Sequence, residues 1–522
     1  MKHSTNFIFI AAVLSFFLLG NYGCNIDYPP QSLTVTPGMA ATFSIGISGT
    51  ETRSYQWYKD GVPIPGATWA VYYIPSAQDT DAGSYTVTVS NADVTITSDI
   101  VTLVVSPIVA GPAYELVPSV ISPGSGVPMQ IVFDGWGDET AVELEMKDLS
   151  IRPLNNVPNT NKWWIALTED EVLDGYVLPQ GNDHPALHDL VNFIGELRTK
   201  DSIHPYSVRL YAPVLAPGMP IVTPLMLGNN IQESPHIVNI RYDDLYSSVD
   251  APKNVHQIFF QHYSDDYDFI IQNWLARDNQ MPQHHGTIRN NVSGIGRGII
   301  DNTFEAGAMG TQKLKELIYI SNNSSIDLAQ QVLSHEIGHA FMNYIKDTPL
   351  SVDSPHFPVS TTAFGIMGSS GGWGNSKKLT QVSSSEYIVE PLNPYGGFNE
   401  YELYMMGLLP SWEVPDQIVF SDQAVIPDIG TFIDDAVTTV TIDEVIALNG
   451  PRSPAYPDAQ NAFRAATIVI SRGRLLSEDE MTYLDYMAAR GELQVPIDDQ
   501  YGRPFYVSTG GLATLSTSIH EE

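Results

Sequence analysis

Hydrophobic and polar residues alternate in short runs over the first hundred or so positions of the chain. Turn signals such as Lys59-Asp60-Gly61 separate these runs. Side chains that alternate with a period of two are typical of strands with one buried face. The pattern predicts an antiparallel β sandwich over residues 28–106, with strands in five runs: Ser32–Thr36, Ala41–Ile45, Ser54–Tyr58, Ser84–Val89 and Ile100–Val105.

Two segments of this module resemble immunoglobulin-like domains. Trp57, in Tyr55-Gln-Trp57, matches the tryptophan of their third strand, and the segment from Asp79 to Tyr85 resembles their tyrosine corner. The two cysteines of that family are absent, and Val87 stands near the place of one of them. The resemblance implies an all-β immunoglobulin-like sandwich in which Trp57 packs on a hydrophobic pin. Such modules are usually spacers or binding units.

The next region, residues 107–232, is rich in proline and contains two alternating runs, Ala141–Met146 and Tyr206–Ala212. These runs predict strands, whereas Leu187–Leu197 suggests a short helix. We interpret the region as a middle, mostly-β module.

From about residue 233 the pattern changes to longer elements. Ile237–Arg241 and Leu314–Ser321 predict strands, and Val255–Ala276 and Ile326–Lys346 predict helices. The last part of the chain is interpreted as a helical closing subdomain, from Val440–Ile446, Ala459–Arg472 and Ser477–Arg490. The fold class expected is therefore multidomain, with a C-terminal α+β domain over residues 233–522.

The helix predicted over Ile326–Lys346 contains the motif His335-Glu336-x-x-His339, with Ser324-x-x-Asp327 as its capping box. Histidines four positions apart lie on one face of a helix, so both imidazoles can reach one metal ion. Glu336 cannot be a ligand with them but can hold a water beside the metal. The motif could also arise by chance. However, the helix is apolar almost all round, and two histidines on a buried face need a polar partner. We therefore predict zinc-dependent hydrolysis with Glu336 as the proton acceptor.

A catalytic zinc site normally has three protein ligands. Metzincins place a third histidine shortly after the motif, but Ile345 occupies that position, which excludes the plain metzincin pattern. Gly365–Gly368 resembles their methionine turn, although a glycine-rich loop beneath the site explains it equally well. Gluzincins take a glutamate from a later helix, and Glu400 and Glu402 compete for that role.

These two glutamates cannot both face the metal, because residues two apart point about 200° apart around a helix. Glu402 lies at the centre of the apolar face of the segment, where a carboxylate needs a metal or an arginine partner. Glu400 points away, although Asn399-Glu400 resembles the pair in thermolysin-like enzymes. Glu402 is the predicted third ligand.

The stretch from Gly294 to the end is similar to uncharacterised secreted bacterial metallopeptidases of the zincin type. They carry the same motif on a helix and a later Leu-Tyr-x-Met-Gly-Leu segment preceded by an acidic residue, here Glu402. The resemblance implies a zincin-like fold with one zinc ion, and it supplies no substrate. A further hydrogen-bond donor is usual in such sites, and four candidates remain open: His284, His285, Tyr395 and Tyr404.

Composition and the N-terminus bear on location and partners. The 522 residues carry a net charge of −34, which argues against a nucleic-acid partner. Residues 1–24 predict an export signal, with an apolar run over Phe7–Gly20. Cys24, the single cysteine, resembles the lipid-modified cysteine of bacterial lipoproteins. We expect a cell-surface or outer-membrane lipoprotein, with ordinary secretion as the alternative and membrane contact only through that anchor.

Three functions remain after these observations. The first is a zinc metallopeptidase that hydrolyses peptide bonds of extracellular proteins. The second is a non-catalytic surface adhesin or scaffold that binds through the immunoglobulin-like module. The third is a zinc hydrolase acting on another bond. The intact His335, Glu336 and His339 favour an enzyme, because an inactive relative would have no reason to keep Glu336.

Overall fold

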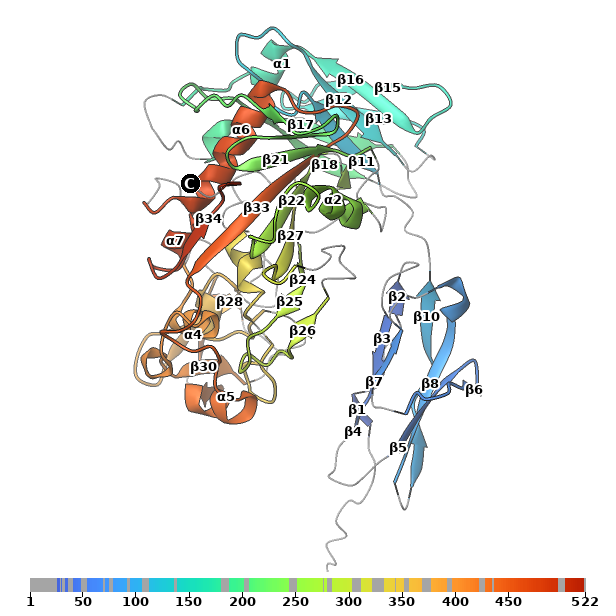
Figure 1. Cartoon of the computed structure of the whole chain (residues 1–522), viewed down its shortest axis with the longest axis vertical. Coiled ribbons are helices and arrows are strands. Elements are labelled where there is room, and N and C mark those ends of the chain that lie inside the picture. Colours follow the sequence, from blue (N-terminus) through green and yellow to red (C-terminus); the bar gives the residue numbers. More distant parts are fainter. Residues whose placement is uncertain are drawn as a thin grey trace, which may run out of the picture. The chain divides into compact units, whose positions relative to one another are not determined.

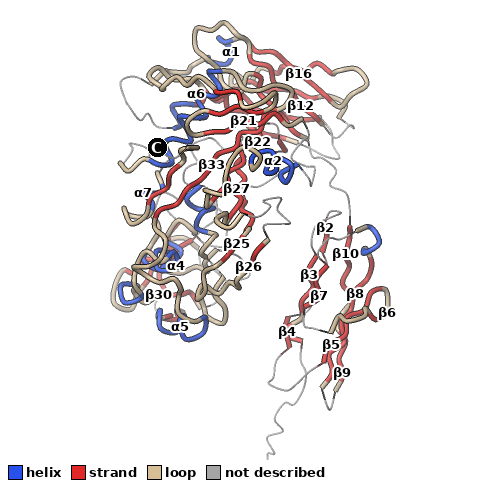
Figure 2. Tube along the Cα trace, viewed as in Figure 1, coloured by secondary structure: helices blue, strands red, loops and turns tan. Residues whose placement is uncertain are grey.

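The computed structural model of the chain divides into two compact units, residues 1–108 and 109–522. Strands predominate and helices are few (Figure 2). The predicted export signal and Cys24 lie outside the residues that the structure describes. Those residues are 26–28, 30, 33–35, 41–47, 54–68, 71–74, 78–91, 94–105, 112–135, 139–179, 187–200, 206–243, 251–275, 277–278, 284–302, 311–321, 333–342, 344–351, 356–368, 377–391, 397–421, 428–433, 436–495 and 503–520.

The first unit is built from short strands. Its largest sheet has the order β2-β10-β8-β5-β6 with β9 paired to β8, while β3 pairs with β7 and β1 with β4. The elements are β1 (Ile26–Tyr28), β2 (Leu33–Val35), β3 (Ala41–Ser44), β4 (Gly46–Ile47), β5 (Ser54–Lys59), β6 (Val62–Pro63), β7 (Val71–Ile74), the 3-10 helix η1 (Asp79–Asp81), β8 (Gly83–Ser90), β9 (Thr95–Thr97) and β10 (Val101–Val105). All five predicted strands have a counterpart here.

The core of this unit contains the features expected from the sequence. Trp57 is fully buried and lies opposite Val87 in the β5–β8 ladder. The hydroxyl of Tyr85 donates to the carbonyl oxygen of Asp81 over 2.7 Å. Phe43 stacks on the Tyr85 ring, with centroids 4.7 Å apart. The tryptophan, the hydrophobic pin and the tyrosine corner are therefore all present.

The second unit begins with a β sandwich of two sheets around one apolar core. One sheet has the order β15-β16-β12-β11-β23 and the other β14-β13-β17-β18. The strands are β11 (Ala113–Val117), β12 (Met129–Asp134), β13 (Val142–Met146), β14 (Ile151–Pro153), β15 (Asn155–Asn156), β16 (Lys162–Leu167), β17 (Val191–Thr199), β18 (Ser207–Pro213) and β23 (Arg277–Asp278). Helices α1 (Glu169–Leu173) and η2 (Leu187–Leu190) connect them.

The helix predicted over Leu187–Leu197 is wrong, because most of that segment is strand β17. Gly195 lies directly against the backbone of Glu145, where a Cβ would overlap the neighbouring chain. Such a close approach is typical of a glycine in a strand rather than in a helix. The strands predicted near β13 and β18 are confirmed.

The sandwich belongs to the same compact unit as the rest of residues 109–522. Ser119 donates its hydroxyl and its amide to the carboxylate of Glu480, far away in the sequence. Ser122 donates to Asp479 over 2.5 Å. Strand β23 lies much later in the sequence than β11 and nevertheless pairs with it. The predicted middle module is thus a recognisable sandwich that is joined to the later residues by polar and apolar contacts.

The main sheet of this unit has eight strands (Figure 1). Its order is β19-β20-β21-β33-β22-β27-β24, and β34 pairs with β33. β21, β33, β22 and β27 run parallel, and β24 runs antiparallel at one edge. The strands are β19 (Leu225–Met226), β20 (Ile231–Glu233), β21 (Ile237–Arg241), β22 (Phe269–Trp274), β24 (His284–Thr287), β27 (Glu316–Ser321), β33 (Ala462–Ser471) and β34 (Thr514–Ser516).

Two sequence predictions fail within this sheet. The segment Val255–Ala276, predicted as one helix, forms α2 (Ala251–Phe259) and then strand β22. Ala459–Arg472, predicted as part of a helical subdomain, is mostly β33, which lies between β21 and β22. Central parallel strands are buried on both faces and form continuous apolar runs, so they lack the period of two that marks a strand.

The remaining elements surround this sheet. Helix α6 (Glu478–Ala489) begins after Ser477, as predicted, and Ser477 and Glu480 form a capping box. The others are β25 (Arg289–Asn290), β26 (Ile300–Asp301), η3 (Thr362–Phe364), β28 (Lys377–Gln381), β29 (Tyr387–Pro391), α4 (Glu400–Met406), η4 (Ser411–Glu413), β30 (Gln417–Phe420), β31 (Phe432–Ile433), β32 (Val437–Val440), α5 (Ile442–Asn449), η5 (Arg490–Glu492) and α7 (Phe505–Ser508). The C-terminal part is therefore a mixture of helices and strands built into the main sheet.

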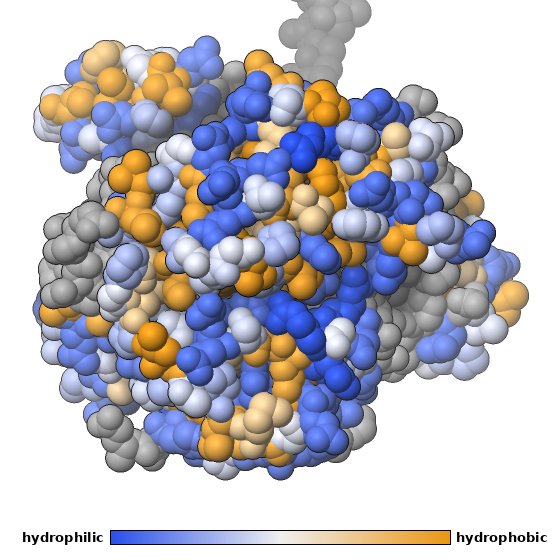
Figure 3. Space-filling view, turned by 90° about the horizontal axis from the view of Figure 1, so that it is seen from above, coloured by the Kyte–Doolittle hydropathy of each residue, from blue (hydrophilic) through white to orange (hydrophobic). Residues whose placement is uncertain are grey.

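The surface seen in Figure 3 mixes hydrophilic and hydrophobic groups. Within the described ranges, no helix is both long and apolar enough to cross a membrane.

Candidate metal centre

The predicted motif lies on a short buried helix. Residues 333–338 are helical and residues 339–341 form a turn. Leu333, Ile337 and Phe341 are buried in the same core as Ile318 and Ile320 of β27, so this histidine helix packs on one face of the main sheet. Burial of the apolar residues of the predicted helix is confirmed for Leu333, Ile337 and Phe341, whereas the expected start and capping box of that helix lie outside the described part of the chain.

The histidine helix ends earlier than Lys346, where the prediction placed its end. The carbonyl oxygen of His339 accepts hydrogen bonds from the hydroxyl of Tyr344, over 2.7 Å, and from Arg297, over 3.4 Å. The amide of Phe341 bonds to Gly338, three residues back, over 2.9 Å. The bond from Phe341 tightens the last turn, and the amide of Met342 also bonds to Gly338, four residues back, over 3.1 Å.

Three histidines converge at this place: His335, His339 and His356. Their nearest ligand atoms all lie within 4.8 Å of one another. The Nε2 atom of His335 is 3.2 Å from Nε2 of His339 and 3.2 Å from Nε2 of His356. Two nitrogens of one tetrahedral zinc ion are about 3.4 Å apart, so these spacings suit such an ion.

The hydrogen-bonding state of His335 supports the same interpretation. Its Nδ1 lies 3.0 Å from the carbonyl oxygen of Ile366. A carbonyl oxygen only accepts, so Nδ1 carries the proton and Nε2 presents one lone pair. One lone pair cannot accept well-aligned hydrogen bonds from both His339 and His356. A single cation among the three nitrogens would satisfy all of them, and a backbone partner for the second nitrogen is usual for metal-binding histidines.

Burial keeps these imidazoles neutral, as metal ligands must be. It lowers the pKa of His335 to about 4, against the raising effect of the bond to Ile366. Burial also lowers the pKa of His339 well below its usual value, and nearby histidines lower it further. The pKa of His356 is lowered by burial and then by His285.

The prediction overlooked His356. It follows a proline in an irregular segment, where no periodicity points to a ligand. The next residue holds it in place: Phe357 is fully buried, packs edge-to-face on Tyr401, and bonds through its amide to the carbonyl oxygen of Gly368. One signal was available, because after His339 the sequence contains two histidines, His356 and His520.

Glu336 is buried beside the histidines, with 5% of its surface exposed. Burial raises the pKa of its carboxyl group to about 7, while His285 lowers it and Glu316 raises it. A carboxyl group whose pKa lies near neutrality can both accept and release a proton.

Among the candidate donors whose side chains the structure describes, His285 lies at the cluster. Its ring stacks on His339, with centroids 4.3 Å apart and an interplanar angle of 16°. Its Nδ1 lies 3.0 Å from the carboxylate of Glu316, which is 1% exposed and also accepts from Thr287. β24 and β27 are adjacent strands, so the sheet itself holds this pair beside the site.

Of the other candidate donors, the structure describes the side chain of Tyr404. Tyr404 lies near the C-terminal end of α4, and burial raises the pKa of its hydroxyl. Tyr395 falls outside the described residues. His284 belongs to β24.

Glu402 is not brought into the histidine cluster. Its side chain is completely buried, accepting from the amide of Met367 over 3.1 Å and from that of Asn399 over 2.9 Å. Burial raises its pKa to about 8, against the lowering effect of the backbone of Asn399, Met367 and Ile366. Glu402 thus contacts the loop that carries the partner of His335. Glu400 is exposed, as expected.

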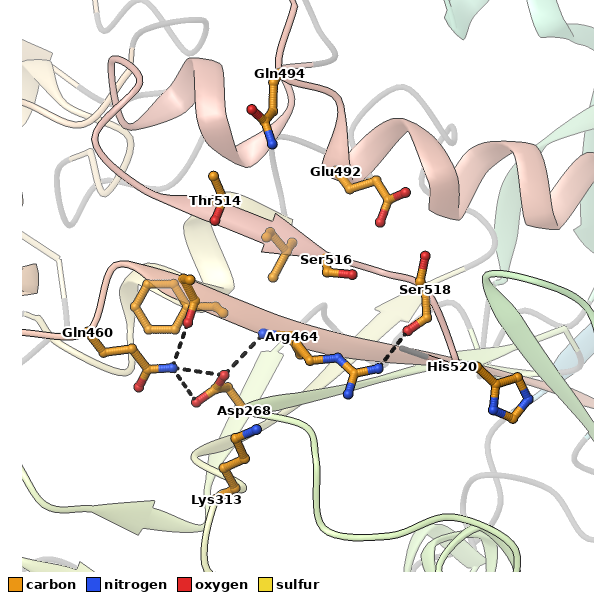
Figure 4. Close-up of a pocket in the computed structure, with 13 residues that line it drawn as sticks. Asp268, Lys313, Gln460, Arg464, Glu492, Gln494, Thr514, Ser516, Ser518 and His520 are labelled. Atoms are coloured by element: carbon orange, nitrogen blue, oxygen red, sulfur yellow. Dashed lines mark hydrogen bonds between the residues drawn. The ribbon is translucent and has the colours of Figure 1, made fainter. Parts of the chain in front are cut away.

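A separate pocket of about 750 Å³ opens near the start of β33 (Figure 4). Its charged groups are engaged within the chain. Asp268 accepts from Gln460 and from the amide of Arg464, while the Arg464 guanidinium donates to the carbonyl oxygen of Ser518. None of the three clustered histidines lines it.

Comparison with known proteins identifies one part of the chain. Residues 25–91 match the immunoglobulin domain family. A decoration protein of Escherichia phage T5 is 47% identical over 62 residues, which are 12% of this chain and 38% of that protein. The chain therefore spans well under half the length of this curated relative.

Solved structures of titin domains also align with a small part of the chain. The titin M4 domain is 20% identical over 16% of this chain and 95% of its own, with a TM-score of 0.15. A chimeric titin Z1Z2 carrying a KLER peptide from decorin is 26% identical over 16% of this chain and 94% of its own, with a TM-score of 0.15. Scores this low carry no conclusion. The family match and the packing of Trp57 and Tyr85 establish an N-terminal immunoglobulin-like domain.

Proposed function

We propose that the second unit is a zincin-like metallopeptidase in which His335, His339 and His356 bind one zinc ion. The observation that carries the proposal is the convergence of three imidazole nitrogens, from two buried histidines and the partly buried His356, at spacings suited to a tetrahedral ion. Three ligands leave room for water or substrate, as in catalytic zinc sites. His356 takes the place for which the sequence suggested Glu402.

The surrounding architecture supports a zincin-like α+β arrangement. A strand, β27, precedes a buried helix that carries both motif histidines, and the helix packs on the sheet containing that strand. β24 pairs antiparallel with β27 and forms one edge of the sheet. A loop at Gly365–Gly368 lies beneath the histidines, since a Cβ on Gly338 would overlap the sulfur of Met367.

The chemistry divides between the ion and the side chains. A zinc ion held by His335, His339 and His356 would supply a Lewis acid able to polarise a carbonyl group and acidify water. Glu336 accepts a proton from the attacking water and passes it to the leaving amine, a role suited to its raised pKa of about 7. His285, oriented by Glu316, hydrogen-bonds the reacting group beside His339.

The substrate class follows from the expected location. An exported protein with a lipid-modified Cys24 would meet proteins outside the cell, and we propose that it cleaves peptide bonds in them. Hydrolysis of another amide bond by the same residues would require the same water activation.

The direct test uses purified residues 25–522. We expect about one zinc ion per chain by elemental analysis and cleavage of peptides from a mixed library that stops when the metal is removed. A chain that binds no zinc, or that cleaves equally well without it, would refute the proposal. Zinc binding with cleavage of no peptide but of another amide would keep the metal centre and change the substrate.

A second function is favoured by the N-terminal domain. Its match to the immunoglobulin domain family and its lack of buried charged side chains, among the residues described, suit a binding module. We propose that it attaches the enzyme to a surface partner. Loss of surface binding on deletion of residues 28–106, with unchanged peptide cleavage, would support this division of roles.

A further inference from the structure

We infer that Glu402 is a positioning residue that holds the backbone carbonyl orienting the metal-binding imidazole of His335. This inference rests on the proposed zinc centre. It concerns a buried carboxylate that contacts neither the metal-binding nitrogens nor an arginine, although the sequence suggested one of these two roles.

The connection runs through the loop Gly365–Gly368. The Ile366 carbonyl oxygen accepts from Nδ1 of His335 over 3.0 Å. The next amide, that of Met367, donates to Oε1 of Glu402 over 3.1 Å. The Ile366 carbonyl and the Met367 amide belong to one peptide group. His335, a proposed ligand, binds one side of that group, and Glu402 binds the opposite side. The position of the carbonyl oxygen, and with it the ring of His335, depends on both bonds.

The second carboxylate oxygen ties the loop to helix α4. Oε2 of Glu402 accepts from the amide of Asn399 over 2.9 Å. The side chain of Asn399 donates to the carbonyl oxygen of Thr362 over 2.7 Å. Thr362 begins η3, which directly precedes the loop. The capping box of α4 therefore also anchors the loop, which a capping box in an isolated helix does not do.

Gly365 lies directly against Glu402. A Cβ on Gly365 would overlap the carboxylate of Glu402. Gly365 has φ −75° and ψ −176°, values that an alanine can adopt, so its need for a glycine is steric. Partners of this kind, which orient a ligand without touching the metal, typically contribute 10–100-fold to metal affinity.

The test compares Glu402→Gln with Glu480→Gln. Both glutamates complete a capping box and both are completely buried. Glu480, however, contacts Ser119 and Arg474, neither of which belongs to the loop Gly365–Gly368. Zn²⁺ affinity is measured by chelator competition, and the visible spectrum of the Co²⁺-loaded protein reports the ligand geometry. We expect a 10–100-fold loss of affinity and a shifted Co²⁺ spectrum in Glu402→Gln, with neither in Glu480→Gln.

Two results would overturn the inference. One is a folded Glu402→Gln protein with wild-type affinity and spectrum. The other is X-ray absorption showing a carboxylate ligand in the wild type that disappears in Glu402→Gln, because Glu402 would then bind the metal itself.

A second variant tests the inference if Glu402→Gln folds poorly. Gly365→Ala leaves Glu402 intact but pushes the loop away, so it should lower affinity similarly. Combined with Glu402→Ala it should cause no further loss, since the overlap is removed. Full additivity of the two losses would contradict the coupling.

Hydrogen exchange separates failure of the inference from failure of the zinc centre. If the wild type binds no metal, the proposed function fails. Exchange of residues 362–368 in the metal-free protein still tests the positioning role. It should be faster in Glu402→Gln and unchanged in Glu480→Gln, and equal exchange in all three proteins would refute it.

Discussion

The two units of the protein bury different kinds of side chains. In the immunoglobulin-like unit, Ser98 is the one polar side chain buried among the described residues, and the core is made of apolar groups such as Trp57 and Val87. The second unit buries carboxylates and imidazoles, including Glu316, Glu336 and His339. Buried ionisable groups are costly unless they are paired or bind a metal.

The first core is apolar, whereas the second also buries ionisable groups of the kind that the proposed chemistry requires. Apolar packing in the first unit needs no ligand to complete it. In the second unit, the ligand atoms of three histidines lie within 4.8 Å of one another, and a bound cation would complete that arrangement. Chemistry is therefore expected from the second unit alone.

The largest expected effect is on turnover. Glu336→Gln should keep the zinc ion and lower peptide cleavage by about 10²–10⁴-fold, because the proton acceptor is lost. Zinc content and cleavage rates of the purified variant check this. Glu400→Gln, an exposed change nearby, should leave both unchanged. Full activity in Glu336→Gln would show that another group accepts the proton.

The first unit should respond in stability and not in chemistry. Trp57→Ala should destabilise it by about 3–5 kcal/mol through loss of a fully buried side chain. Urea unfolding followed by tryptophan fluorescence measures the loss, and zinc content reports on the second unit. A fall in zinc content would contradict the separation of the two regions.

His356→Ala tests the ligand that the sequence did not indicate. Removal of a direct ligand should lower zinc affinity by more than the roughly 100-fold expected for a supporting residue. His520→Ala serves as control, since His520 is exposed and bonds to Glu233. Chelator competition measures both. If His356→Ala binds zinc as tightly as the wild type, the three-histidine centre is wrong.

His285→Ala should lower cleavage by about 100-fold, the loss typical for one hydrogen-bond donor to the reacting group. Zinc affinity should stay near the wild-type value, because His285 stacks on His339 without joining the cluster. Glu316→Gln should cause a smaller loss, since the ring remains but is less well oriented. A large loss of zinc in His285→Ala would make it a ligand.

The smallest effect concerns a histidine of the second unit that is paired instead of clustered. Burial lowers the pKa of His236, but bonds to Asp485 and Glu492 outweigh it and raise the pKa to about 9. A folded-state pKa above the unfolded value of about 6.5 means that the stabilisation is full below that pH. It should fade as pH rises towards 9, by about 1–3 kcal/mol.

Unfolding free energies at pH 6 and pH 9.5 test this expectation, with His236→Gln as the comparison. The variant should lose most of the difference between the two pH values. An unchanged difference would assign the pH dependence to other groups.

Local sequence patterns predicted the strands of the first unit and two of the histidines of the proposed site. The period-two runs, Trp57 and the corner around Tyr85 lie within a short stretch of chain, and the helix spacing alone places His335 and His339 on one face. Reasoning from local patterns failed for β22 and β33, which are buried on both faces of the sheet. Their apolar runs do not distinguish a central parallel strand from a helix.

The sequence by itself determined that His335 and His339 lie on one face of a helix with Glu336 between them. Only the tertiary structure decided which residues complete the site. His356 enters through an irregular loop and His285 through an edge strand. Glu402 turns to the loop at Met367 because the chain folds α4 against it. Helical phase predicted that Glu402 is buried, but phase cannot tell which segment, distant in sequence, meets a buried carboxylate.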